Sequence, residues 1–273
     1  ILGGSTLTGP DQATTWNLTG AGTGSLSGFV NGLTYQNIEN LTGGAGNDTF
    51  TFSSGSVAGL VNGGGGTNAL DYAAIGANVN VNLATGSANS MGGFLNIVGF
   101  VGGSGTNSLT GLNLDSIWNL TGADTGNIGG SISFLNFQNL TAGGGGDVFN
   151  FLGNANISGN LDGGAGFDTL NYSAWTGGVP FVIFGGVTPG TAAGVGGTII
   201  NFEGVLGLPK SKTLELPDFT TSYDDFDRHK KLGWDGEGKD PKTRGQVGFS
   251  MDYSYVERYR GEKVLTGGVH TKP

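Results

Sequence analysis

Short runs in which apolar and polar residues alternate recur along residues 1–208. The pattern is clear at Phe50 and Phe52, and again at Phe149 and Phe151. A period of two over a few residues, bounded by Gly and Asn, predicts β-strands. No stretch shows a capped helical pattern, and the many glycines would each destabilise a helix by ~1 kcal/mol. We therefore expect an all-β fold.

A glycine-rich motif separates these runs and returns at spacings near 20 or 40 residues. Its copies are GGAGNDTF, GGGGTNAL, GGSGTNSL, AGGGGDVF and GGAGFDTL, which begin at Gly43, Gly63, Gly102, Ala142 and Gly163. A unit of about 20 residues is too short to bury its own apolar face, but stacked units form a continuous core joined by backbone ladders. The sequence therefore predicts a right-handed parallel β-solenoid with about 20 residues per coil over residues 1–208.

The corners of such a coil need residues that tolerate positive φ. Gly adopts that conformation without strain, and Asn tolerates it. We expect it at the Asn residues beside the glycine clusters, which are Asn40, Asn62, Asn107 and Asn139. Stacked Asn side chains are also candidates for a hydrogen-bonded ladder.

Two of the glycine motifs carry a family resemblance. GGAGNDTFT (Gly43–Thr51) and GGAGFDTLN (Gly163–Asn171) resemble the calcium-binding nonapeptide GGxGxDxUx of RTX proteins. The surrounding NLTG and NIENLTGG segments are similar in style to bacterial surface proteins of the filamentous-haemagglutinin type. The resemblance covers residues 1–207 and implies a secreted β-solenoid, often part of a longer polypeptide, used in adhesion or surface structure. It also implies an extracellular or cell-surface location in a bacterium.

The resemblance makes Asp147, Asp168 and Asp48 candidate calcium ligands. Calcium takes six to eight oxygen ligands, and RTX proteins supply them from tandem motifs. Here the motifs stand alone, and Asn68 and Asn107 occupy the Asp position in two of them. Only Asp147 and Asp168 could face each other on adjacent coils, whereas Asp48 would stack on Asn68. The preferred interpretation is structural: Asp or Asn caps its tight turn through the backbone N–H groups of that same turn. No cofactor other than calcium is a candidate.

The distribution of charge excludes one class of partner. All 12 Lys and Arg residues lie between Lys210 and Lys272, while residues 1–209 contain ten acids. A nucleic-acid partner needs Lys and Arg to displace counterions from phosphates, so we exclude it for residues 1–209. No apolar run approaches the ~20 residues of a membrane span, and the chain has no cysteine. A surface of Asn, Thr, Ser and Gly is typical of a secreted protein.

Catalysis is not expected. Solenoids also carry polysaccharide lyases and hydrolases, but glycoside hydrolysis needs paired carboxylates, and the lyases commonly use Arg or Lys. Both histidines, His229 and His270, lie outside the repeats. Trp16 and Trp118 begin equivalent repeat units, WNLTGAGTGSL and WNLTGADTGNI, which favours a core role. Trp175 is the better candidate for an exposed sugar contact.

The composition changes abruptly at Pro209, where a charged, aromatic segment (residues 209–273) begins. It contains an alternating run that predicts a strand, with VLTGGV (Val264–Val269) returning beside it after a turn at Arg260-Gly261. The apolar positions of that run, the candidate docking residues, are Val247, Phe249, Met251, Tyr253 and Tyr255. This segment either caps the last coil or docks on another protein.

Together these features favour a non-enzymatic structural or adhesive protein of the cell surface, either a subunit of a larger assembly or a fragment of a longer protein. Its expected partner is a second copy, joined end to end, or another surface protein. The alternatives are a calcium- or carbohydrate-binding surface module and, less favoured, a polysaccharide-degrading enzyme.

Overall fold

The computed structural model describes residues 4–28, 32–185 and 189–208 together with four strands further along the chain. Contacts within the chain divide it into two units, Ile1–Leu208 and Pro209–Pro273. Every regular element among the described residues is a β-strand, so the predicted all-β class is confirmed. None of these residues forms a helix long and apolar enough to cross a membrane.

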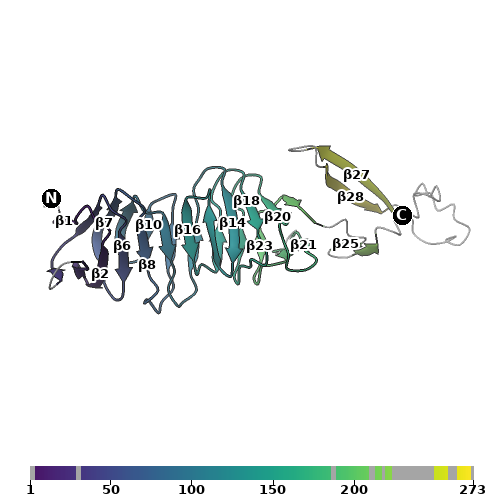
Figure 1. Ribbon diagram of the computed structural model, residues 1–273. Helices are drawn as coiled ribbons and strands as arrows, with labels where there is room; N and C mark the ends of the chain where they lie inside the picture. The colour runs from purple at the N-terminus through teal and green to yellow at the C-terminus, as the bar shows by residue number, and fades with distance from the viewer. Residues whose placement is uncertain are drawn as a thin grey trace, which may run out of the picture. The chain divides into compact units, whose positions relative to one another are not determined.

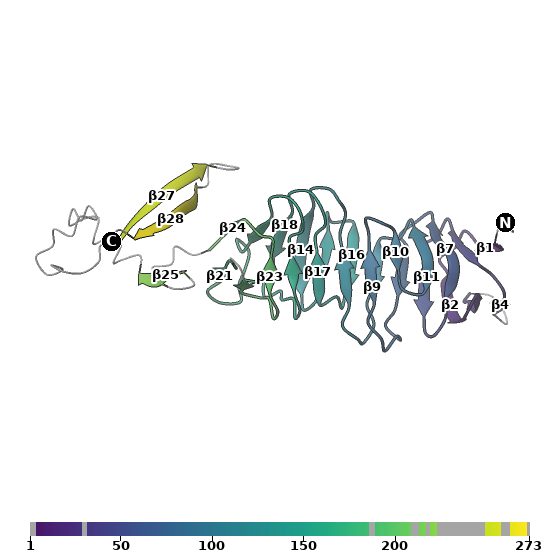
Figure 2. The same ribbon diagram turned by 180° about the vertical axis from the view of Figure 1, so that it is seen from behind.

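Most strands of the first unit belong to three sheets, in which they lie side by side in rows (Figures 1 and 2). The four-stranded sheet has the order β1 (Thr6–Thr8), β5 (Asn40–Gly44), β7 (Val57–Gly64) and β11 (Met91–Leu95). The six-stranded sheet has the order β10 (Ser87–Ala88), β9 (Asn80–Asn82), β13 (Ser108–Thr110), β17 (Asn139–Thr141), β19 (Leu161–Asp162) and β23 (Ile199–Ile200). The 12-stranded sheet has the order β24 (Gly204–Leu206), β20 (Thr169–Asn171), β18 (Val148–Phe151), β14 (Ile117–Gly122), β15 (Thr125–Ile128), β16 (Ile132–Leu135), β12 (Gly99–Val101), β8 (Ala69–Asp71), β6 (Thr49–Phe52), β2 (Thr15–Gly20), β3 (Thr23–Leu26) and β4 (Leu33–Tyr35). A separate antiparallel pair joins β21 (Val182–Ile183) to β22 (Thr191–Ala192).

The chain moves from sheet to sheet, and most strands pair in parallel with a strand from the neighbouring coil. Thr49 of β6 lies opposite Ala69 of β8, 20 residues later, as the predicted unit requires. Other neighbours are further apart in sequence: Leu161 of β19 lies opposite Ile199 of β23. The predicted spacing of about 20 residues therefore holds for some pairs of strands, and insertions lengthen the others.

The pairing is not parallel throughout, which corrects the prediction. Strands β2, β3 and β4 form an antiparallel meander, and so do β14, β15 and β16. Strand β12 pairs with β16 rather than with β14. Strands β15 and β16 therefore lie between β12 and β14 in the 12-stranded sheet. The tight turns at Gly22 and Asp124 have φ of +57° and +51°, as a short hairpin connection requires.

The first unit contains two long repeats, residues 5–103 (repeat A) and residues 107–208 (repeat B). Each repeat has one meander near its start. Trp16 and Trp118 are fully buried in equivalent places, which confirms their expected core role. Their rings stack on Phe50 and Phe149, with centroids 5.4 and 5.1 Å apart. One coil further on, Tyr72 stacks on Phe52 in repeat A, as Tyr172 does on Phe151 in repeat B. The core therefore combines stacked aromatic pairs, at equivalent places in both repeats, with many aliphatic side chains.

Asparagine adopts positive φ at corners, though not where it was expected. The residues that do so are Asn37, Asn96, Asn136 and Asn201. A ladder of Asn side chains runs across the 12-stranded sheet instead: Asn171 donates to Asn150, and Asn150 donates to Asn119, at 2.8 and 2.9 Å. The expected ladder therefore exists, at residues within strands rather than beside the glycine clusters.

In the second unit the structure describes two antiparallel strand pairs. Strand β25 (Thr213–Leu216) pairs with β26 (Phe219–Ser222). Strand β27 (Phe249–Glu257) pairs with β28 (Lys263–Thr271), which confirms the predicted strand and its returning partner. Four of the candidate docking residues lie at alternate positions of β27, namely Phe249, Met251, Tyr253 and Tyr255. Val247 and the turn expected at Arg260-Gly261 lie outside the described residues.

Candidate functional site

The candidate calcium ligands belong to a column of buried polar side chains. Each member follows a glycine-rich corner and is shielded from solvent. Asp48, Asn68, Asp147 and Asp168 precede strands of the 12-stranded sheet, and Asn107 holds the corresponding position before β13 of the six-stranded sheet. In every one, the side-chain Oδ1 accepts a backbone N–H from a neighbouring coil. The donors are the amides of Thr14, Asp48, Val79, Ser116 and Asp147, at 2.7 to 3.0 Å.

This arrangement places two of the candidates together. The Asp147 amide donates to Asp168 Oδ1 at 2.7 Å, so these residues lie on adjacent coils, as the sequence predicted. Asp48 lies elsewhere in the stack, with its amide bonded to Asn68 Oδ1 at 2.8 Å, which was also predicted. The capping interpretation needs one change. The N–H groups come from the neighbouring coil rather than from the residue's own turn.

The second side-chain atom distinguishes Asn from Asp in this column. Asn68 Nδ2 donates to the carbonyl oxygens of Gly65 and Asn96, at 2.9 and 3.0 Å. Asn107 Nδ2 likewise donates to two carbonyl oxygens, both at 2.8 Å. By contrast, Oδ2 of Asp48, Asp147 and Asp168 is buried and has no hydrogen-bond partner among the described residues.

A carbonyl oxygen lies close to this second atom in Asp168 as well. A Cβ added at Gly63 would touch both Asn96 O and Asn68 Nδ2, and a Cβ added at Gly163 would touch both Asn201 O and Asp168 Oδ2. Two acceptor oxygens repel each other when the acid is ionised, whereas a protonated carboxyl can donate to the carbonyl. The Asp168 site therefore suits a neutral acid.

The pKa values of these acids move in the same direction. Burial raises the pKa of Asp168 to about 6. Burial, together with the negative charge of Asp168, raises the pKa of Asp147 to about 6. Burial also raises the pKa of Asp48. Desolvation disfavours the charged form of a carboxyl group, so the column favours protons on these residues.

No group of three or more His, Cys, Asp or Glu side chains in the described part of the chain could hold a metal ion. Asp147 and Asp168 each use Oδ1 for a neighbouring amide, which leaves one oxygen apiece. Calcium needs six to eight oxygens, so this pair alone provides too few ligands.

Sequence reasoning missed a second set of acceptors in the same stack. The carboxylate of Glu39 accepts the Ser5 amide, Gln138 Oε1 accepts the Asn107 amide, and Glu203 accepts the Asp168 amide, at 2.6, 2.7 and 2.8 Å. A signal for them is present in the chain, because Asn-Ile-Glu, Asn-Phe-Gln and Asn-Phe-Glu end at these three residues. Glu203 continues the row of Asp147 and Asp168 in the 12-stranded sheet, Gln138 plays the same part next to Asn107 in the six-stranded sheet, and Glu39 does so next to Ser5 in the four-stranded sheet.

Trp175 is partly buried rather than freely exposed. Its ring packs edge-on against Phe151 and Tyr172, with centroids 6.0 and 5.9 Å away. Gly177 and Gly194 lie so close to the ring that a Cβ on either would contact it. Trp175 therefore contributes to the core of the last coils, which weakens its case as a sugar-stacking platform.

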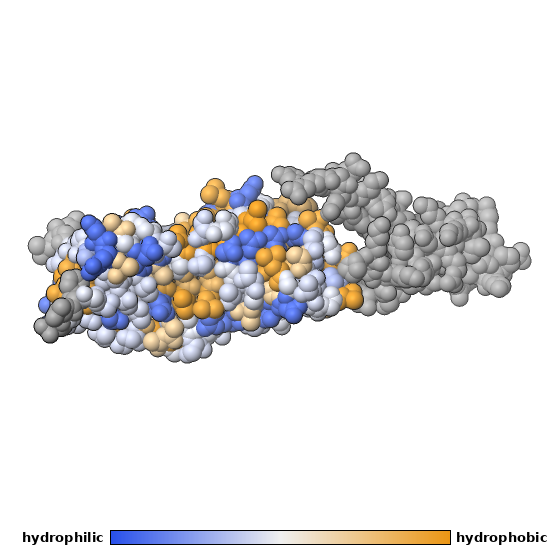
Figure 3. Space-filling view, in the orientation of Figure 1, coloured by the Kyte–Doolittle hydropathy of each residue, from blue (hydrophilic) through white to orange (hydrophobic). Residues whose placement is uncertain are grey.

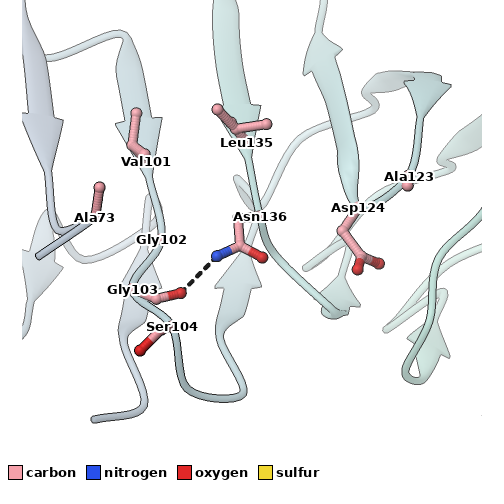
Figure 4. A pocket seen from close by; sticks show the side chains of 9 residues that line it. All are labelled: Ala73, Val101, Gly102, Gly103, Ser104, Ala123, Asp124, Leu135 and Asn136. Atoms are coloured by element: carbon pink, nitrogen blue, oxygen red, sulfur yellow. Dashed lines mark hydrogen bonds between the residues drawn. The ribbon is translucent and has the colours of Figure 1, made fainter. Parts of the chain in front are cut away.

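A groove on the described surface is a candidate for ligand binding. It has a volume of about 470 Å³ and lies beside the inserted meander, with Val101, Leu135, Asp124 and Asn136 in its lining (Figure 4). Asn136 already donates to a backbone carbonyl of Gly103, and the Asp124 carboxylate accepts the Ser158 amide at 2.7 Å. With a single carboxylate in its lining, this groove lacks the pair that glycoside hydrolysis needs.

The outer face of the 12-stranded sheet mixes hydrophobic and hydrophilic areas (Figure 3). Ile117 and Leu135 are exposed on this face, and the Asn119–Asn150–Asn171 ladder runs across it.

No protein-family model matches the chain, and no curated protein or solved structure is significantly similar to it.

Proposed function

We propose that residues 1–208 form a right-handed parallel β-solenoid that serves as a non-enzymatic structural or adhesive rod. We place it outside the cell or on the surface of a bacterium. The parallel ladders between successive coils and the stacked aromatic pairs support the solenoid assignment. The resemblance of the glycine motifs to secreted repeat proteins supports the location.

The observation that carries the proposal is the use of the acidic side chains. Eight of the ten acids in residues 1–208 accept a hydrogen bond from a residue at least 21 positions away in sequence, whereas Asp71 accepts the Ala73 amide of its own turn and Asp11 accepts none from the described residues. The same residues include no Lys, Arg or His that could complete a catalytic set. The polar groups of this unit therefore hold coils together, which is the property that a structural rod needs.

A calcium- or carbohydrate-binding module is the alternative, with the second unit as its cap. A polysaccharide-degrading enzyme would need a second carboxylate across from Asp124. Neither alternative gains a specific contact from the described residues, so the structural role is preferred. The candidate docking strand β27 remains part of the proposal as a contact to a partner protein.

Calcium and glycan binding provide the test of this function. We expect the thermal midpoint of the full chain to stay within about 1 °C between excess CaCl₂ and EDTA, because a ligand that binds only the native state would raise it. Trp175 fluorescence should not respond to a panel of bacterial and host polysaccharides, with Trp175→Phe as the background control. A calcium-dependent rise that Asp147→Asn abolishes would instead establish the binding module.

A further inference from the structure

Repeats A and B join through a junction inside the chain. Strand β12, the last strand of repeat A in the 12-stranded sheet, pairs in parallel with β16 of repeat B, with Phe100 opposite Phe134. The Ser133 amide donates to Val98 O at 2.7 Å, and the Gly102 amide donates to the carbonyl of Leu135 at 2.9 Å. In the six-stranded sheet, β9 pairs with β13 across the same junction.

The end of repeat B reproduces the β12 side of that junction. The segment NFEGVL (residues 201–206) corresponds to NIVGFV (residues 96–101), and both begin with an Asn at positive φ. The Gly99 amide donates to Asn68 O, and the Gly204 amide donates to Asp168 O, at 3.0 and 2.9 Å. Strand β24 pairs with β20 as β12 pairs with β8. Strand β24 therefore holds the position in repeat B that β12 holds in repeat A.

The start of repeat A reproduces the β16 side. Strand β4 pairs with β3 as β16 pairs with β15, with Tyr35 opposite Gly24 and Phe134 opposite Gly126. The two strands continue into related segments, YQNIENLTGG and FLNFQNLTAG. Strand β4 therefore holds the position in repeat A that β16 holds in repeat B. The equivalent positions are Thr34 and Ser133, Tyr35 and Phe134, and Gln36 and Leu135.

Both surfaces stand at the ends of the 12-stranded sheet, and no strand of the described residues pairs with their outer edges. Burial shows what the internal junction adds. Leu109 of β13 is 1% exposed, whereas its equivalent in β1, Leu7, is only partly buried. At the opposite end Val179 and Phe181 are 77% and 53% exposed beside β21. Each end thus leaves apolar side chains at least partly exposed.

We propose that β24 of one molecule pairs with β4 of a second copy of this chain. The internal junction sets the register: Gly204 lies opposite Thr34, Val205 opposite Tyr35, and Leu206 opposite Gln36. The Thr34 amide then donates to the carbonyl of Glu203, as Ser133 does to Val98. This pairing rests on the structural function proposed above and names its partner.

The assembly that follows is a head-to-tail stack. The two surfaces differ, so the contact is heterologous, and a heterologous contact that does not close generates a filament. Unpaired strand edges favour such addition, because each new strand satisfies a row of backbone donors and acceptors. The acidic units repel one another, so assembly increases with ionic strength as salt screens that repulsion.

Sedimentation velocity of the full chain over a range of concentrations tests the stack. Thr34→Pro removes the outward amide of β4, and Val205→Pro removes the corresponding amide of β24; proline is tolerated on an edge strand because that edge carries no internal bond. Thr34→Ser and Val205→Ile keep both amides and are the matched controls. We expect species larger than dimers for the wild type and both controls, and monomers for each proline variant alone.

Mixing the two proline variants sharpens the test. The Thr34→Pro molecule keeps its β24 end and the Val205→Pro molecule keeps its β4 end, so an equimolar mixture should form dimers and nothing larger. A wild type that stays monomeric at every concentration overturns the proposal, and so do proline variants that assemble like the wild type. Either result leaves the calcium and glycan test of the structural function untouched.

Site-directed cross-linking gives a readout that does not depend on proline. The chain has no cysteine, so Gln36→Cys and Leu206→Cys introduced together provide the only thiols. Oxidation should give a ladder of covalent oligomers on a non-reducing gel. Gln36→Cys combined with Ile117→Cys is the control, because Ile117 lies in the middle of the sheet. Equal ladders from both pairs, or none from the first, contradict the register.

Discussion

At the scale of single residues, one atom decides how the buried column behaves. Asn68 and Asn107 place an N–H donor where Asp48, Asp147 and Asp168 place an oxygen. Carbonyl groups accept hydrogen bonds from the side-chain amides of Asn68 and Asn107, and the Asn201 carbonyl beside Asp168 disfavours an ionised carboxylate there. Leaving a buried polar atom unsatisfied costs about 1–3 kcal/mol, so the acids stabilise the stack best when protonated.

This arrangement predicts that stability falls as the pH rises. The folded-state pKa values of Asp147 and Asp168 lie at about 6, above the ordinary value of about 3.9. The folded state therefore binds more protons than the unfolded state between these values, and unfolding becomes easier with increasing pH. Thermal unfolding followed by circular dichroism should show the midpoint decreasing from about pH 4 to about pH 6 and levelling off above. A midpoint that rises across this window would contradict protonated acids.

Exchanging the two residue types should move stability in opposite directions. Asp168→Asn supplies a donor facing Asn201 O, and we expect it to stabilise the protein at pH 8 by about 1–3 kcal/mol, with little effect at pH 4. Asn68→Asp, the reverse change in repeat A, should destabilise the protein at pH 8 by a similar amount. Chemical denaturation at both pH values measures the two effects. Asp168→Asn that destabilises the protein at pH 8 would argue for a bound cation or an ionised acid.

At the scale of strands, hydrophobic alternation predicted where strands lie but not how they pair. Trp118 and Leu120 alternate in the same way whether the next strand returns antiparallel or the coil continues. Direction is set by the tight turn at Asp124, whose positive φ depends on three-dimensional context. For the same reason the sequence placed Asp147 beside Asp168 correctly but gave no indication that the Asn201 carbonyl lies near Asp168 Oδ2. That carbonyl comes from a segment distant in sequence.

The Asn ladder offers an element-scale prediction. Asn150 in β18 accepts from Asn171 and donates to Asn119, so Asn150→Ala removes two hydrogen bonds on the outer face. A typical net contribution is about 0.5–1.5 kcal/mol per bond, and we expect a loss of roughly 1–3 kcal/mol. Thr51 holds the equivalent position of β6 in repeat A, so Thr51→Ala is the matched control. Equal losses from both variants in urea unfolding would show that the ladder contributes nothing specific.

At the scale of the whole molecule, residues 1–208 repeat a unit of about one hundred residues rather than a single coil. The shorter period near 20 residues dominates the sequence because the glycine motifs are the most conspicuous feature. The longer period follows from the meanders, which occur once in each repeat and define what meets at a junction. This larger unit explains why the two ends of residues 1–208 resemble the two sides of the internal junction.

A deletion of one whole repeat tests this view of the molecule. Gly103 and Leu208 follow equivalent strands, β12 and β24, so joining Gly103 directly to Pro209 removes repeat B without opening a new kind of edge. Stability in stacked repeats is approximately a sum of unit and interface terms, and the denaturant m-value scales with the surface exposed on unfolding. We expect the shortened chain to fold, to keep its β-sheet circular dichroism per residue, and to unfold with a smaller m-value and a lower midpoint.

A matched deletion that joins Gly76 to Pro209 ends inside a coil and should fail to fold. If both deletions fold equally well, coils rather than long repeats are the structural unit. If neither deletion variant folds, repeat A requires repeat B for its stability. The long repeat is then not an independent folding unit.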